Sequence, residues 1–175
     1  MPDLLIRIKK KSDGSAALSC LRADGSVTWQ RQEGQIGRFF PLHDLTHYAV
    51  ETVLGFRRAF YGLLADGWDI SDFGKPGASH RMDAEGGLAE LIVGFFDLER
   101  ATGVLGTAAE LNDKIQSFYN DQGLQPPSFA VTEAQVTGIR ERRGELFARW
   151  SGVPPGETIE LAFDREAERA GVERV

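Results

Sequence analysis

Two histidines lie four residues apart near the start of the longest helical pattern in the chain. They are His43 and His47, two of the three histidines among 175 residues, and Asp44 directly follows the first of them. Residues four apart are neighbours on one face of an α-helix, so both imidazoles can reach one metal ion. The spacing is that of the paired histidines in H-E-x-x-H zinc enzymes, with Asp44 in place of the glutamate. We therefore predict that Asp44 orients a ligand or activates a bound water molecule.

Two glutamates are candidates for the remaining ligands. Glu51 lies one further turn along the helix and can bind the ion or hold a ligand histidine by a hydrogen bond. His43 and Glu51 are about 12 Å apart along a helix that rises about 1.5 Å per residue, so another element must contribute a group. Glu90 is an isolated acid in an apolar helical segment, with Asp97 on its own side. The predicted metal ligands are therefore His43, His47, Glu51 and Glu90.

Glycines on these two segments favour a close approach of the helices that carry the candidate ligands. Gly55 and Gly62 continue the face of Glu51, and Gly94 lies one turn beyond Glu90. A glycine inside a helix costs about 1 kcal/mol relative to alanine and usually needs a packing reason. We expect the two helices to meet through these faces. Several acids in such a dry interface would be costly unless a cation neutralised them.

Imidazole and carboxylate ligands suit zinc first, and iron, nickel and manganese as well. The leading prediction is a divalent-metal protein, either a hydrolase or a lyase, that acts on an unidentified small molecule. Two alternatives stay open. On a helical wheel His47 and Glu51 lie opposite Ala49, so the polar side can be a solvated face, or a hydrogen-bonded site without metal. The protein would then be a non-enzymatic interaction or structural module, and the exposed edges of its sheet would support a protein partner or a homodimer.

The stretch from Phe40 to Glu51, followed by Gly67-Trp68-Asp69-Ile70, resembles a group of small bacterial proteins to which no function is attached. Its H-D-x-x-H characters are similar to a motif of the Coq4 family of ubiquinone biosynthesis. That family has a glutamate twelve residues after the second histidine, where this chain has Ala59. The His-Asp pair also resembles that of HD-domain phosphohydrolases. Those proteins are all-helical and have a histidine upstream of the pair, whereas this chain has none before His43.

The N-terminal third predicts an antiparallel three-stranded meander. Apolar and polar residues alternate from Leu4 to Lys9, over residues 16–22 and from Val27 to Arg31, and Asp-Gly turns separate these runs. Cys20 lies on the apolar face of the second run and is expected to be a core residue. Residues 158–163 alternate again. Because a lone strand is not stable, we expect them to join the sheet as a fourth strand.

Helical patterns occupy most of the chain between these strands. They cover residues 41–65, 86–102, 107–123 and 132–150, with Pro41 suited to a first helical position. Capping boxes mark the start of the last two. The pattern at 86–102 is apolar on most sides, so we expect that helix to be central. Several glycines interrupt residues 66–87, which we expect to be a long loop without regular structure.

These patterns predict one α+β domain, a three- to four-stranded antiparallel sheet packed against about four helices. Its parts are a β-meander at 1–32, a helical part at 41–151, a returning strand at 157–164 and a charged tail at 165–175.

Composition excludes several classes of protein. The formal net charge of −6 argues against nucleic-acid binding, which needs a basic surface. No apolar run approaches the roughly 20 residues that span a bilayer, and the start of the chain shows no secretory signal. A single cysteine excludes an internal disulfide framework. A cytoplasmic location is therefore expected.

Overall fold

The computed structural model describes residues 2–31 and 34–166, and it contains one four-stranded antiparallel sheet. The strands are β1 (Leu4–Lys10), β2 (Ala16–Arg22), β3 (Val27–Arg31) and β4 (Thr158–Phe163). Their order is β3-β2-β1-β4, with Leu4 opposite Phe163 and Ile8 opposite Ile159. The predicted meander and the returning fourth strand are therefore confirmed.

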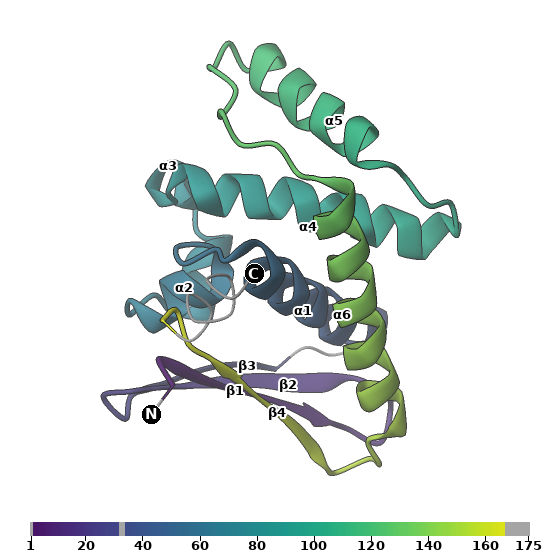
Figure 1. Ribbon diagram of the computed structural model, residues 1–175. Helices are drawn as coiled ribbons and strands as arrows, with labels where there is room; N and C mark the ends of the chain where they lie inside the picture. Colours follow the sequence, from purple (N-terminus) through teal and green to yellow (C-terminus); the bar gives the residue numbers. More distant parts are fainter. Residues whose placement is uncertain (1, 32–33, 167–175) are drawn as a thin grey trace.

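One face of the sheet carries the core. Because side chains alternate along a strand, Leu4, Ile6 and Ile8 all point to the same face, where they are fully buried together with Cys20. The helices lie on this face (Figure 1). The predicted α+β class is confirmed.

The helices form successive layers above the sheet. They are α1 (Gly34–Leu54), α2 (Phe60–Ala65), α3 (Ala78–Arg81), α4 (Ala84–Thr102), α5 (Ala108–Asp121) and α6 (Glu133–Gly152). In Figure 1, α1 lies next to the sheet, α4 lies beyond α1 and α5 is outermost, while α6 runs from the level of α4 back to the sheet. The predicted capping boxes open α5 and α6. The layers place α1 between the sheet and α4.

The first long helix differs from the prediction at both ends. It begins at Gly34, so Pro41 lies inside the helix and not at its first position. It ends at Leu54, because Gly55 has a φ of +67° and the N–H of Phe56 donates to the carbonyl of Glu51 at 2.9 Å. This is a Schellman turn, which terminates a helix. The predicted single helix over 41–65 is therefore two helices, α1 and α2.

Residues 66–87 are more ordered than predicted. They include α3 and a short 3-10 helix, η1 (Ile70–Gly74). The side chains of Asp69 and Asp72 form a reciprocal capping box at the start of η1, which satisfies backbone N–H groups there. Arg22 of β2 donates to the carbonyl of Leu64 at 2.6 Å and ties the end of α2 to the sheet. The expectation of a loop without regular structure was wrong.

Helix α4 is central on one side only. Ile92, Val93 and Phe96 are fully buried, but Gly94 is exposed and the Leu98 residue is 51% exposed. The expectation that this helix is central therefore holds for its inner face alone. Of the predicted charged tail, residues 167–175 lie outside the described residues.

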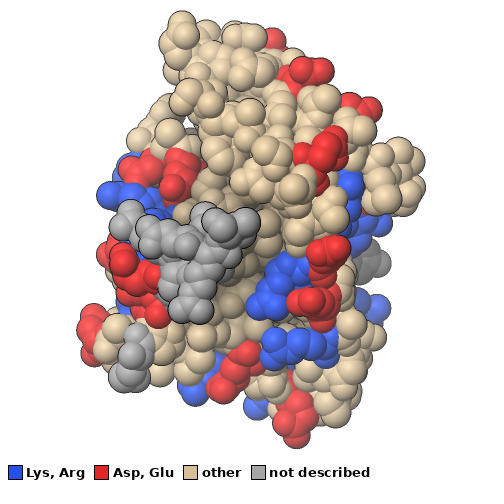
Figure 2. All heavy atoms as spheres, viewed as in Figure 1, with Lys and Arg blue, Asp and Glu red and all other residues tan. Residues whose placement is uncertain are grey.

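The surface carries charges of both signs. Basic and acidic side chains intermingle over the sheet and α6, while the part of this face over α5 shows acidic and uncharged residues (Figure 2). Within the described ranges, no helix combines the length and the apolar character that crossing a membrane requires.

Candidate metal centre

The contact between α1 and α4 brings three of the four predicted ligands together. His43, His47 and Glu90 each offer a ligand atom, and these atoms all lie within 4.8 Å of one another. The Nε2 atom of His47 lies 3.6 Å from Oε1 of Glu90. The two histidines come from α1 and the glutamate from α4, so the fold assembles a group that is distant in sequence. Metal binding by this group stays a prediction.

A carboxylate on α4 holds the first histidine. Nδ1 of His43 lies 2.6 Å from Oδ2 of Asp97, a short hydrogen bond in which the imidazole N–H donates. Burial acts against the charge on Asp97, but the hydrogen bond from His43 and the charges of His43 and Arg100 lower the pKa of this carboxyl. With its proton on Nδ1, His43 presents the lone pair of Nε2 to another partner.

The second histidine also has a carboxylate behind it. Nδ1 of His47 lies 3.4 Å from Oε1 of Glu51, and both side chains are buried. Neither of these two atoms has a hydrogen-bond partner among the described residues. The other oxygen of Glu51 accepts the backbone N–H of Tyr61 at 3.0 Å. Of the two roles predicted for Glu51, its position fits that of holding a ligand histidine, since it faces Nδ1 and not Nε2.

The turn at Gly55 explains how Glu51 is held. Its left-handed backbone reverses the chain, so the N–H of Tyr61 in the first turn of α2 returns to the Glu51 carboxylate. Gly62 is needed for the same turn, because a Cβ there would lie 1.9 Å from the carbonyl oxygen of Arg57. A Cβ at Gly55 or Gly94 would meet nothing within 4 Å. The prediction that these glycines allow α1 and α4 to approach was therefore wrong.

The polar side of α1 is buried and not solvated. Asp44 and Glu51 are both buried, and His47 is 2% exposed, so the alternative of a solvated helix face was wrong. Aromatic rings flank the imidazoles: Phe39 stacks on His43 at 5.3 Å, and Phe60 lies 5.1 Å from His47. These rings limit the positions that the two imidazoles can adopt.

Asp44 is buried, as His47 is, but it is not one of the three clustered residues. The hydroxyl of Tyr61 donates to the backbone carbonyl of Asp44 at 2.9 Å, and burial raises the pKa of the Asp44 carboxyl to about 7. The same carboxyl acts electrostatically on Cys20 of β2. Its predicted role in catalysis stays a prediction.

The electrostatic environment favours a cation. Burial opposes a charge on His47, but Glu51 and Glu90 outweigh it and raise the pKa of this imidazole. Burial raises the pKa of Glu51. With Asp44 and Asp97, four carboxyl groups surround two imidazoles. A bound cation would compensate charge that is otherwise costly to bury.

One side of the cluster opens to solvent. The side chain of Glu90 is 44% exposed and that of His43 is partly exposed, whereas His47 lies beneath them. Catalytic zinc sites have three protein ligands and one position left for water or substrate, whereas structural sites are closed by four. With three candidate ligand atoms and one side open to solvent, a tetrahedral ion here would have one position free.

Two groups that hold the site were not predicted in that role, the carboxylate of Asp97 and the backbone N–H of Tyr61. Asp97 was expected near the histidines but was not assigned to either of them, and its spacing of seven residues from Glu90 is the signal that places both on one face of α4. The contact of the Tyr61 N–H with Glu51 could not be predicted from residue types, because it depends on the turn at Gly55.

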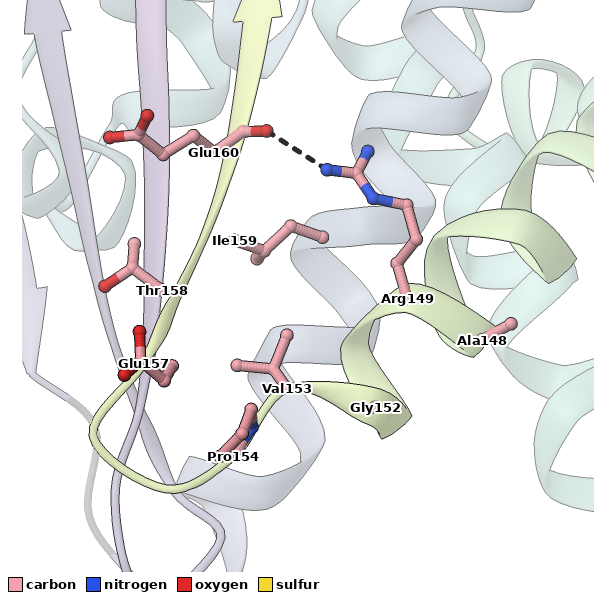
Figure 3. A pocket seen from close by; sticks show the side chains of 9 residues that line it. All are labelled: Ala148, Arg149, Gly152, Val153, Pro154, Glu157, Thr158, Ile159 and Glu160. Atoms are coloured by element: carbon pink, nitrogen blue, oxygen red, sulfur yellow. Dashed lines mark hydrogen bonds between the residues drawn. The ribbon is translucent and has the colours of Figure 1, made fainter.

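A separate hollow lies between the end of α6 and β4 (Figure 3). It has a volume of about 620 Å³, and Arg149 donates across it to the carbonyl of Glu160 at 3.4 Å. Its titratable lining residues are Arg149, Glu157 and Glu160, and none of the histidine cluster borders it. This hollow therefore does not extend the candidate metal centre.

Comparison of the chain with protein-family models, with curated proteins and with solved structures gave no match. The function of the site must therefore be argued from its own geometry.

Proposed function

We propose that this protein binds one divalent metal ion, zinc in the first place, through His43, His47 and Glu90. The observation that carries the proposal is the approach of their ligand atoms to within 4.8 Å. Further support comes from the carboxylates of Asp97 and Glu51 behind the two imidazoles, the usual partners of metal-bound histidines. Iron, nickel and manganese suit the same ligands.

The function that we propose is that of a metal-dependent hydrolase or lyase acting on a small molecule. A divalent ion at this place would supply Lewis-acid chemistry. Within the chain, Asp97 and Glu51 fix the imidazoles, and Asp44 keeps its predicted role of orienting a ligand or activating water. The substrate would approach from the exposed side of Glu90.

Calorimetry on the full chain tests metal binding. After treatment with a chelator, the protein is titrated with Zn²⁺, Mn²⁺, Ni²⁺ and Fe²⁺, and we expect near-unit stoichiometry for at least zinc. Glu90→Gln should weaken binding at least about 10-fold and still fold, because Glu90 is partly exposed. Glu141→Gln, at an exposed position of α6, is the matched control and should bind like the unchanged protein.

Two results would contradict the metal site: no binding of any of the four ions, or equal binding by the Glu90 and Glu141 variants. A separate assay addresses catalysis. Chromogenic carboxylic and phosphoric esters should be hydrolysed by the metal-loaded protein, and chelation or Glu90→Gln should abolish this activity. Metal binding without turnover of these esters would remove the hydrolase assignment and leave the metal site in place.

A further inference from the structure

The link between α1 and α2, residues 55–59, is bound by a carboxylate at the start of α4. The backbone N–H groups of Arg57 and Arg58 both donate to the same oxygen, Oε1 of Glu85, in the first turn of α4. Successive backbone N–H groups that point the same way bind an anion well. The Glu85 carboxylate occupies this position, so it joins the link to the helix that carries Glu90.

Helices α2 and α4 contact the backbone of the link from two sides. On the α2 side, a Cβ at Gly62 would lie 1.9 Å from the carbonyl oxygen of Arg57, so only glycine fits there. On the α4 side, a Cβ at Gly86 would contact the carbonyl oxygen of Arg58 at 3.5 Å. The side chain of Arg58 also pairs with Asp83, directly before α4. The position of the link is therefore fixed relative to both helices.

The link in turn determines where the amide of Tyr61 lies. Two residues separate Arg58 from Tyr61, whose N–H donates to Oε2 of Glu51 at 3.0 Å. The other oxygen of Glu51 lies 3.4 Å from Nδ1 of His47. A displacement of the link would move the Tyr61 amide, and the carboxylate behind His47 would lose its only backbone donor among the described residues. The contacts thus form one continuous path from α4 to the imidazole.

We infer that Glu85 is a positioning residue of the candidate metal centre, which holds Glu51 behind His47 by binding the backbone of the link. Glu85 is not one of the three clustered residues, so it acts through other groups. Helix α4 would then supply the ligand Glu90 and also orient the ligand His47. The inference rests on the proposed function, because this orientation has a role only if His47 binds the metal.

A glutamate elsewhere in the chain provides a matched control. Glu133, the first residue of α6, accepts the backbone N–H of Ala108 at 2.7 Å. Like Glu85, it lies in the first turn of a helix and joins that turn to the backbone of another segment. Neither residue of this contact belongs to the histidine cluster. Glu133→Ala therefore removes a contact of the same kind without touching the path to His47.

The metal-free protein tests the position of Glu51 directly. In Glu85→Ala, the Tyr61 amide should exchange with solvent at least about 10-fold faster. Nitrogen-15 NMR at alkaline pH should show His47 change from a form with the proton on Nδ1 to a mixture of tautomers. Glu85→Gln should restore both properties, because its side-chain carbonyl can accept the two N–H groups. Glu133→Ala should leave both unchanged.

Glu85→Asp guards against a failure of the alanine variant to fold. Aspartate keeps a negative charge at the start of α4, which stabilises the helix, but it is one methylene shorter and should not reach the link. It should therefore change the Tyr61 exchange rate and the His47 spectrum as Glu85→Ala does. Circular dichroism checks that each variant folds. If the folded aspartate variant has normal Tyr61 exchange and a normal His47 spectrum, Glu85 has no positioning role.

Zinc titration of the same full-length proteins connects this role with metal binding. Glu85→Ala should weaken zinc binding about 10-fold, and Glu85→Gln should restore it. An equal loss in Glu133→Ala would show that general destabilisation is the cause and overturn the inference. If the unchanged protein binds no zinc, the proposed function fails, whereas the measurements without metal still decide whether Glu85 holds Glu51 and His47 in place.

Discussion

Asp97 on α4 accepts a 2.6 Å hydrogen bond from Nδ1 of His43 on α1, a contact that joins the two helices at the candidate metal centre. Because this bond fixes the proton on Nδ1, it determines which nitrogen of His43 can bind a metal. The same relation recurs at longer range between Glu51 and His47. The two carboxylates therefore lead to separate predictions.

Asp97→Asn should weaken zinc binding about 10- to 100-fold, because the amide cannot supply the charge that supports the imidazole. The measurement is competition with a chromophoric chelator. Asp113→Asn, at an exposed position of α5, is the control and should bind zinc normally. If both variants bind zinc equally well, Asp97 has no positioning role.

Glu51→Gln should lower metal affinity by changing the tautomer of His47. Glutamine can still accept the N–H of Tyr61 through its carbonyl, which turns its NH₂ group towards Nδ1 of His47. Nδ1 must then accept, so the proton moves to Nε2, the nitrogen that faces Glu90. Nitrogen-15 NMR of the imidazole reports the tautomer directly. An unchanged His47 spectrum in the folded variant would contradict this account.

Cys20 should resist thiol reagents until the protein unfolds. The residue is fully buried, and burial raises the pKa of its thiol from 9.0 to about 12. At mildly alkaline pH, labelling should therefore follow global unfolding, and added zinc should slow it if zinc binds the native state. Fast labelling of the native protein would show that β2 is accessible.

The same thiol predicts a pH dependence of stability. The unfolded thiol releases its proton near pH 9.0, whereas the folded one keeps its proton up to about pH 12. The stability that depends on this proton is therefore present below pH 9.0 and is lost as the pH rises towards 12. Urea unfolding across this range should show the loss, and Cys20→Ala should reduce it.

Glu99→Gln should destabilise the fold by about 3–5 kcal/mol, the usual cost of breaking a buried ion pair. The carboxylate of Glu99 is buried, binds Arg140, lies 3.3 Å from Arg143 and accepts the N–H of Gly106 at 3.0 Å. It therefore joins α4 to α6 and to the start of the α5 segment. Urea unfolding measures the change in the free energy of unfolding.

A surface ion pair on α6 provides the control for Glu99. Arg142 and Glu145 lie 3.0 Å apart at partly exposed to exposed positions, and such pairs contribute less than about 1 kcal/mol. Glu145→Gln should therefore have little effect on unfolding. If Glu99→Gln is equally mild, the buried network does not stabilise the contact between α4 and α6.

The fold could be predicted where its signals are local. The meander follows from alternation and Asp-Gly turns, and the pairing of β4 follows from the instability of a lone strand. The break between α1 and α2 was missed because the apolar spacing continues in phase from Ala49 through Phe56 to Leu63. In that context Gly55 was interpreted as a packing position, whereas its positive φ ends the helix.

In the candidate site, too, the features with a local signal in the sequence were predicted, and those that depend on contacts between helices were not. The spacing of His43 and His47 is a local signal, and Glu90 was noticeable as a lone acid in an apolar segment. The position of Glu51 behind His47 depends on a backbone N–H that a turn returns from α2, and side-chain types do not encode such a contact. Burial of the polar face could not be predicted from α1 alone, since α2 and α4 provide it.

The turn at Gly55 makes the centre sensitive to the length of the chain at a place that contains no ligand. An extra residue between Phe56 and Ala59 would carry the Tyr61 amide away from Glu51 and leave His47 free to rotate, while the sheet and the packing of α6 on α1 stayed as they are. Insertions of this kind should be harmless in the connection between α5 and α6, but they should abolish the predicted metal binding when placed in the five-residue link 55–59. Loop-length variants, together with ligand substitutions, would thus distinguish changes in the stability of the fold from changes in the orientation of the two imidazoles.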